Sequence, residues 1–207
     1  MQAVSPWELK TGTKDCIYVL GVDPGYRNLA WVLFRAYPKE KKVEVAAFDC
    51  VDVQPAHPLK KQEEIICAIL SYLETKRDIF KVADHIIIEN QMIGKHTKPL
   101  IQGTAWILGA RLLRLAEWSS MEFMDARKKF KEFKKTVRLP YQKRRGMPRK
   151  LIKANSIALA MGLIAQYSIP KSMTIFQTGK ESEWEHLADA AGIAFVKIIG
   201  DLFKEEK

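Results

Sequence analysis

Two short apolar runs, each ending on an acidic residue, set the strongest limits on how this chain folds. Residues 17–23 read IYVLGVD and lead into Pro-Gly, and residues 85–89 read HIIIE. Runs of this length and composition are typical of strands buried on both faces of a sheet. An acid at the end of such a strand lies at the rim of the sheet. If the two strands are neighbours, Asp23 and Glu89 converge there, which is costly unless a cation neutralises them.

The other apolar patterns place these two strands in a larger α/β domain. The predicted strands are residues 17–23, 29–34, 43–48, 85–89 and 121–124. The predicted helices are residues 60–77, 99–118, a segment ending near 135, 150–166 and 183–203. A hairpin followed by crossover connections indicates a mixed sheet with helices on both faces.

Length and composition favour one domain over residues 16–207, preceded by an irregular extension over residues 1–15. The chain has 207 residues, 47% of them hydrophobic, and no apolar run approaches the roughly 20 residues that span a bilayer. We therefore expect no membrane association. Residues 1–14 are polar and lack the apolar stretch of a signal peptide, so we expect no secretion signal. Three widely spaced cysteines fit buried thiols in an intracellular, reducing compartment. Cytoplasm, a virus factory and an organelle are not distinguished, although the extension lacks the arginines of a mitochondrial transit peptide.

The net charge of +10 is concentrated in one stretch of the chain. Residues 127–153 hold 13 basic residues and one acid, a net of +12, whereas the other 180 residues hold 21 basic and 23 acidic side chains. Such a block attracts a polyanion, most plausibly nucleic acid, although charge runs also occur as solvated faces. The basic residues predicted to contact phosphates are Lys128, Lys129, Lys131, Lys134, Lys135, Arg138, Lys143, Arg144, Arg145, Arg149, Lys150 and Lys153.

The last predicted helix carries a polar pair on an otherwise small and apolar surface. His186 and Asp189 are three residues apart and so lie on one helix face. The alanines and glycine between residues 188 and 194 allow this helix to lie close against the sheet. Taken alone, the pair is better explained as part of a partly solvated helix edge than as a functional site. Asp23 in Asp-Pro-Gly likewise has a simpler interpretation as a turn residue.

Taken together, these motifs resemble the RuvC-type Holliday junction resolvases of the RNase H-like superfamily. The segments that carry the resemblance are VLGVDPGYRNLAWVLF at 19–34, HIIIENQ at 85–91 and EHLADAAGIA at 185–194. The first motif is most similar to the poxviral and fungal mitochondrial branch, since bacterial members usually have Gly where this chain has Ala30. The similarity extends from about residue 17 to residue 199, with the basic segment between the second and third motifs.

The resemblance implies an RNase H-like fold with a five-stranded mixed sheet, and a homodimer that nicks two opposing strands of a four-way DNA junction. Asp23, Glu89, His186 and Asp189 would be the catalytic residues and the ligands of two Mg²⁺ ions per active site, with Mn²⁺ as a substitute. Two such ions can activate water and neutralise the leaving oxygen. Many members have aspartate where this chain has His186, which leaves open whether His186 binds metal or moves a proton. Glu185 is a competing fourth ligand.

Two other functions remain compatible with the same residues. One is a different RNase H-like nuclease, acting on RNA:DNA hybrids, flaps or branched DNA. The other is a non-catalytic nucleic-acid-binding module of the same fold. Two further segments have implied roles in family members: residues 90–98 would probe the junction core, and the helix at 99–118 would form the dimer contact. An ordinary surface loop and an intramolecular core helix are the simpler interpretations of these segments.

Overall fold

The structure is a computed structural model, and parts of the chain are not described in it. The described ranges are residues 15–25, 28–53, 62–90, 99–115, 120–133, 137–141, 147–169 and 181–204. The predicted extension, apart from Asp15, and residues 91–98 of the predicted junction-probing loop lie outside them. The boundary between extension and domain therefore stays a prediction.

Five strands form one mixed sheet in the order β3-β2-β1-β4-β5. The strands are β1 (Ile17–Pro24), β2 (Leu29–Tyr37), β3 (Lys42–Val51), β4 (His85–Asn90) and β5 (Ser120–Asp125). The first three are antiparallel neighbours, whereas β4 runs parallel to both β1 and β5. The predicted mixed sheet is confirmed, with the two acid-ended strands side by side.

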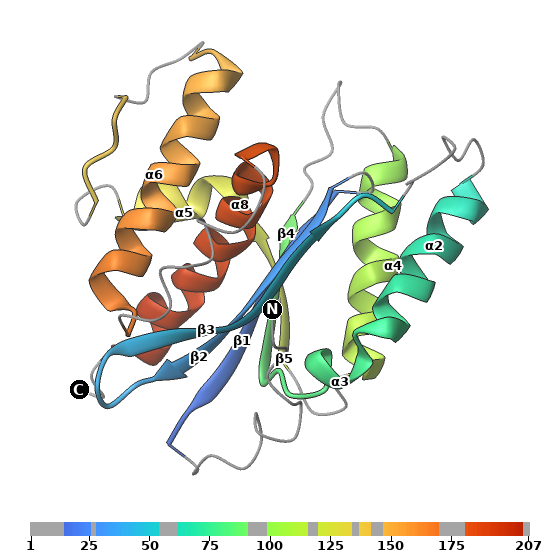
Figure 1. The fold of residues 1–207 in the computed structure, drawn as a ribbon, viewed down its shortest axis with the longest axis horizontal. Coiled ribbons are helices and arrows are strands. Elements are labelled where there is room, and N and C mark those ends of the chain that lie inside the picture. Colours follow the sequence, from blue (N-terminus) through green and yellow to red (C-terminus); the bar gives the residue numbers. More distant parts are fainter. Residues whose placement is uncertain are drawn as a thin grey trace.

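Helices cover both faces of this sheet, as predicted (Figure 1). One face packs on α5 (Ala126–Phe133), α6 (Arg149–Tyr167) and α8 (Glu181–Lys197), and the other on α2 (Gln62–Thr75), α3 (Arg77–Phe80) and α4 (Pro99–Leu115). Alternate residues of β1 enter the two cores: Val19 faces α8, and Leu20 faces the α2–α4 side. This alternation follows from the two-residue period of a strand. Among the described helices, none has the length and apolar character needed to cross a bilayer.

Helix α8 lies unusually close to β1 because Gly21 has no side chain. A Cβ atom on Gly21 would lie 2.1 Å from the carbonyl oxygen of Ala190 and 2.9 Å from the Cβ of Ala194. The small residues of α8 that face the sheet are buried, as the sequence predicted. This close contact brings the polar residues near the start of α8 above the end of β1.

The structure departs from the predicted elements in two helical segments. The helix predicted over residues 60–77 ends at Thr75, and a separate four-residue helix, α3, follows it. The last helix is α-helical only to Lys197 and ends in a π-helical turn, Ile198–Leu202. Neither feature has a hydrophobic spacing that separates it from an ordinary α-helix, so the apolar pattern did not distinguish them.

Two predictions about apolar side chains also change. The three cysteines are thiols and form no disulfide, but Cys16 and Cys50 are only partly buried and Cys67 is exposed, so the prediction of three buried thiols is wrong. Within α4, the side chains of Leu108, Leu112 and Leu115 belong to the core under the sheet. These leucines are therefore not available for a dimer contact. The side chains of Trp106 and Leu113 are outside the described part of the chain.

Candidate active site

Three carboxylates from three elements meet at one rim of the sheet. The register of β1 and β4 pairs Val22 with Ile88, and the next residue of each strand is an acid, Asp23 and Glu89. Helix α8 adds Asp189 from above. Each of the three offers an oxygen, and these oxygens all lie within 4.8 Å of one another. The parallel pairing of β1 and β4 explains why acids 66 positions apart in the chain become neighbours.

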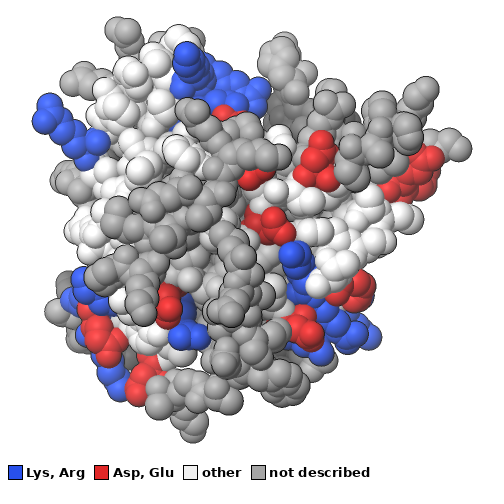
Figure 2. Space-filling view, viewed as in Figure 1, with Lys and Arg blue, Asp and Glu red and all other residues white. Residues whose placement is uncertain are grey.

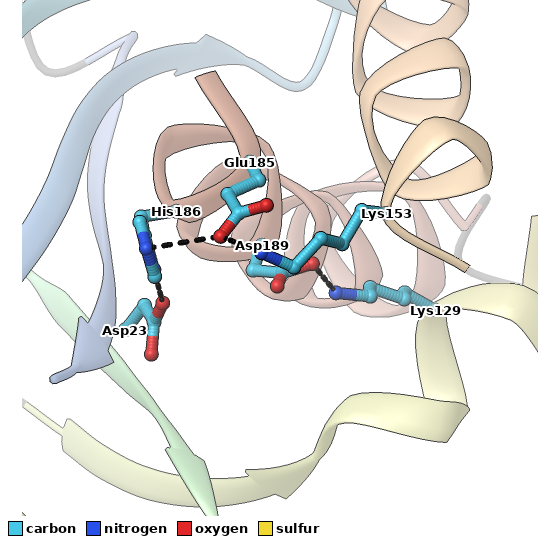
Figure 3. Close-up of polar contacts among 6 residues, drawn as sticks. All are labelled: Asp23, Lys129, Lys153, Glu185, His186 and Asp189. Atoms are coloured by element: carbon cyan, nitrogen blue, oxygen red, sulfur yellow. Dashed lines mark hydrogen bonds and ion pairs between the residues drawn. The ribbon is translucent and has the colours of Figure 1, made fainter. Parts of the chain in front are cut away.

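His186 lies beside this cluster and contacts two carboxylates (Figure 3). Its Nδ1 is 2.9 Å from Oδ2 of Asp23, and its Nε2 is 3.2 Å from Oε1 of Glu185. Burial alone would lower the pKa of His186, but the hydrogen bond to Asp23 and the surrounding negative charges outweigh burial and raise it. Both ring nitrogens face a carboxylate oxygen, an arrangement that favours the protonated imidazole over the neutral one.

Burial makes the ionised forms of Asp23 and Glu89 unfavourable. Burial, together with the charges of Asp23 and Asp189, raises the pKa of Glu89 to about 8. Burial also raises the pKa of Asp23, against the hydrogen bond from His186. Acids buried next to one another in this way bind protons or metal ions more readily than isolated acids do.

Two lysines of the predicted basic segment reach the acids of α8 with their ammonium groups. The ammonium of Lys129, from α5, contacts Oδ1 of Asp189, and its side chain is only 2% exposed. The ammonium of Lys153, from α6, contacts Oε1 of Glu185. Figure 3 shows both lysines approaching the acids of α8 from neighbouring helices. In this structure Lys129 is therefore not a surface phosphate contact, because the acids of α8 draw its ammonium inward.

The other basic residues divide between exposed positions and positions outside the described ranges. The exposed members of the predicted set are Lys128, Lys131, Arg138, Arg149 and Lys150. The members outside the described residues are Lys134, Lys135, Lys143, Arg144 and Arg145. Figure 2 shows basic side chains gathered at the top of this face, where α6 begins in Figure 1. An exposed basic surface thus borders the acidic site.

The donor set suits a hard divalent cation. Carboxylate oxygens are the ligands that Mg²⁺ and Mn²⁺ prefer, and three of them converge here. Burial first, and then the charges of Asp23 and Asp189, raise the pKa of Glu89, so its ionised form is disfavoured at this site. Metal binding would offset that cost. His186 and Glu185 stand outside the group of three, bonded to each other and, through His186, to Asp23.

A five-stranded mixed sheet in this order, with helices on both faces, is the RNase H-like fold as found in the RuvC-type resolvases. No protein-family model and no curated protein sequence matches the chain. Solved structures do match it. The yeast mitochondrial Holliday junction resolvase Ydc2 superposes with a TM-score of 0.59 at 14% identity, over 90% of this chain and 79% of that protein.

Two further structures show the same similarity. Thermus thermophilus RuvC matches with a TM-score of 0.57 at 13% identity, over 89% of this chain and 97% of that one. The fowlpox virus resolvase, solved with its substrate Holliday junction DNA, matches with a TM-score of 0.52 at 15% identity, over 89% and 98% of the two chains. At these identities the similarity establishes the fold, and the expected RNase H-like architecture is confirmed.

Proposed function

We propose that this protein is a structure-selective DNA endonuclease that resolves four-way junctions by metal-dependent hydrolysis of phosphodiesters. The observation that carries the proposal is the convergence of Asp23, Glu89 and Asp189 at one rim of a resolvase-type fold. Three structural neighbours are described as Holliday junction resolvases or their complexes, which supports the choice of substrate.

In this proposal the three carboxylates hold two divalent cations per site. Mg²⁺ is the expected ion, and Mn²⁺ can substitute for it. Bound metal would lower the pKa of an attacking water and stabilise the leaving oxygen. His186 orients the carboxylate of Asp23 through its Nδ1 proton, and Glu185 holds the imidazole at Nε2. A histidine held between two acids is better placed to fix their geometry than to act as a metal ligand.

The exposed basic residues near the site are assigned to the DNA backbone. Lys128, Lys131, Arg138, Arg149 and Lys150 are exposed on α5, on α6 and between them, so they can contact phosphates on either side of a scissile bond. Such contacts give affinity without sequence preference. Selectivity for a junction requires two such surfaces at a fixed angle, and for this reason we propose a homodimer.

The test is cleavage of a synthetic four-way junction in the presence of Mg²⁺. Asp23→Asn removes one carboxylate charge with little change in shape, and we expect the cleavage rate to fall by about 1,000-fold or more. That loss exceeds the 10- to 100-fold effect typical of residues that only orient a ligand. Glu122→Gln, an acid of the same sheet that is paired with Lys197, serves as the matched control. Equal rates for wild type and Asp23→Asn would refute the proposal.

Substrate comparison separates the alternatives. At one salt concentration the protein should cleave a four-way junction faster than an RNA:DNA hybrid, a flap or a linear duplex. A preference for the hybrid or flap would assign it to another nuclease activity of the same fold. Tight junction binding without cleavage at any divalent cation concentration would indicate a non-catalytic binding module, although acids facing DNA weaken binding when no metal is present.

A further inference from the structure

Lys129 is almost fully buried, which is rare for a lysine unless a partner holds its ammonium group. Its side chain is 2% exposed, and its ammonium contacts Oδ1 of Asp189, one of the three converging carboxylates. The ammonium also lies 5.5 Å from the ring centroid of Phe130. Lys128, the preceding residue on α5, is exposed instead. The two neighbouring lysines therefore occupy opposite environments.

The packing of α5 on α8 makes a specific path for the stem of Lys129. A Cβ atom on Gly192 would lie 2.9 Å from Cδ of Lys129, so only glycine leaves space for the stem as it is placed. Gly192 follows Asp189 by three residues, about one helical turn, so the two residues lie on the same face of α8. The lysine thus crosses α8 at a glycine and ends on the carboxylate of the previous turn.

The charge of Lys129 acts on the other two carboxylates of the site as well. It opposes the rise in pKa that burial and neighbouring charges cause in both Asp23 and Glu89. The ammonium is therefore a counterion of the whole cluster and is not confined to its contact with Asp189. A divalent cation at the same carboxylates would be repelled by it at short range in a partly buried setting.

We propose that Lys129 is a positioning residue that acts as the built-in cation of this site and competes with divalent metal for Asp189. The inference rests on the proposed metal binding at the three carboxylates. In the metal-free protein the ammonium holds the acids together. A divalent cation can bind all three carboxylates only when the ion pair between Lys129 and Asp189 breaks. The DNA-free protein therefore binds metal weakly. A phosphodiester bound beside the site adds negative charge, and this charge allows the Lys129 ammonium and the divalent metal to occupy the site together.

The direct test is Mn²⁺ binding to the DNA-free protein, measured by isothermal titration calorimetry at constant pH. Lys129→Met removes the charge but keeps an unbranched side chain of similar length against Gly192. We expect the variant to bind Mn²⁺ about tenfold more tightly or better than wild type. Lys128→Met makes the same change of net charge one residue away on the exposed face, and its affinity should stay within about twofold of wild type.

Thermal unfolding gives a second readout of the same competition. Without metal, Lys129→Met should melt below wild type, because the three acids lose their counterion, and saturating Mn²⁺ should raise its melting temperature more than it raises that of wild type. A merely structural lysine would lower the melting temperature equally with and without metal. Equal or weaker Mn²⁺ binding by Lys129→Met overturns the proposal.

The Mn²⁺ titration uses neither DNA nor cleavage, so it tests the role of Lys129 separately from the proposed junction cleavage. If wild type and Lys129→Met both bind no Mn²⁺, the metal site and the built-in cation are both wrong. If only the variant binds, competition is supported in its strongest form. Should Lys129→Met not fold, the ammonium ¹⁵N signal of Lys129 in wild type decides the question. It should shift on Mg²⁺ saturation, and an unchanged signal counts against displacement.

Discussion

Helix α8 carries two clusters of charged side chains, about two turns apart, that are built in opposite ways. Toward its start, Asp189 converges with Asp23 and Glu89, so acids face acids in a partly buried setting. At its end, Lys197 bridges Glu122 at 2.6 Å and Asp201 at 3.0 Å. The side chains of Glu122 and Asp201 are 41% and 54% exposed, whereas that of Asp23 is 10% exposed.

The two clusters differ in how their charges are balanced. The cluster at Lys197 pairs acids with a base, as ordinary ion pairs do, whereas the cluster at Asp189 places acids beside acids. In the pair of Lys197 with Asp201, each charge is balanced by its opposite and the acid is half exposed, so the pair needs no further ligand. Acids gathered with one another raise the free energy of the fold, and here Lys129 at Asp189 and His186 at Asp23 offset part of that cost. Strained electrostatics of this kind are typical of active sites.

The largest difference between the two clusters should appear in catalysis. Asp189→Asn removes a proposed metal ligand, and we expect junction cleavage to fall by about 1,000-fold or more, beyond the range of outer-shell substitutions. Asp201→Asn makes the same chemical change on the far end of the helical segment and should alter the rate less than about twofold. Both rates are measured on the same junction at saturating Mg²⁺. Similar losses in the two variants would show that the clusters do not differ in function.

The clusters should also differ in how pH affects stability. In the metal-free fold the pKa of Glu89 is raised to about 8, while an unfolded glutamate titrates near 4.5. Between these values the folded state binds more protons than the unfolded state, so stability falls as pH rises from about 4.5 to about 8. Over this pH range the loss of stability is on the order of 4 kcal/mol, since one unit of pKa shift corresponds to about 1.4 kcal/mol.

Denaturant unfolding with EDTA at pH 5 and pH 8 measures this effect. Glu89→Gln should lose most of the decline in stability that wild type shows between the two pH values, and Glu122→Gln should keep it. Adding Mg²⁺ to wild type should reduce the decline, because metal compensates the ionised carboxylates. An unchanged pH slope in Glu89→Gln would mean that Glu89 is not the destabilised acid.

Much of the fold and the acid set could be predicted from the sequence because both follow from local patterns. The apolar runs that end at Asp23 and Glu89 specify buried strands, and parallel pairing then brings their ends together. The spacing of His186 and Asp189, with small residues after them, specifies a helix that can approach the sheet. These relations depend only on strand and helix periods.

The inward lysines could not be predicted in the same way. Lys129 belongs to a dense run of basic residues, and nothing local separates it from Lys128, which is exposed. Its direction depends on a contact with Gly192, 63 positions later in the chain, through the packing of α5 on α8. A glycine within an alanine-rich helix was the one available signal, but glycine alone does not indicate which side chain fills the space.

The smallest expected effect comes from a comparison of two histidines. His186 lies near the start of α8, beside the carboxylates, and His85 lies at the start of β4, at the other end of that strand from Glu89. His186 donates to Asp23, whereas His85, at the start of β4, contacts Oγ of Ser120 at 2.5 Å. We expect His186→Ala to slow junction cleavage by about 10- to 100-fold through misorientation of Asp23. His85→Ala should leave the rate unchanged, since its partner lies far from the carboxylates.

A conservative variant decides what His186 does. Asn can place an amide N–H near the position of Nδ1 and so keep the hydrogen bond to Asp23, but it cannot exchange protons as imidazole does. If orientation is the role, His186→Asn should recover most of the activity lost in His186→Ala, and its pH profile should match that of wild type. If proton transfer by the imidazole is essential, His186→Asn will be as slow as His186→Ala. That result would move His186 from a positioning residue to a participant in the chemistry.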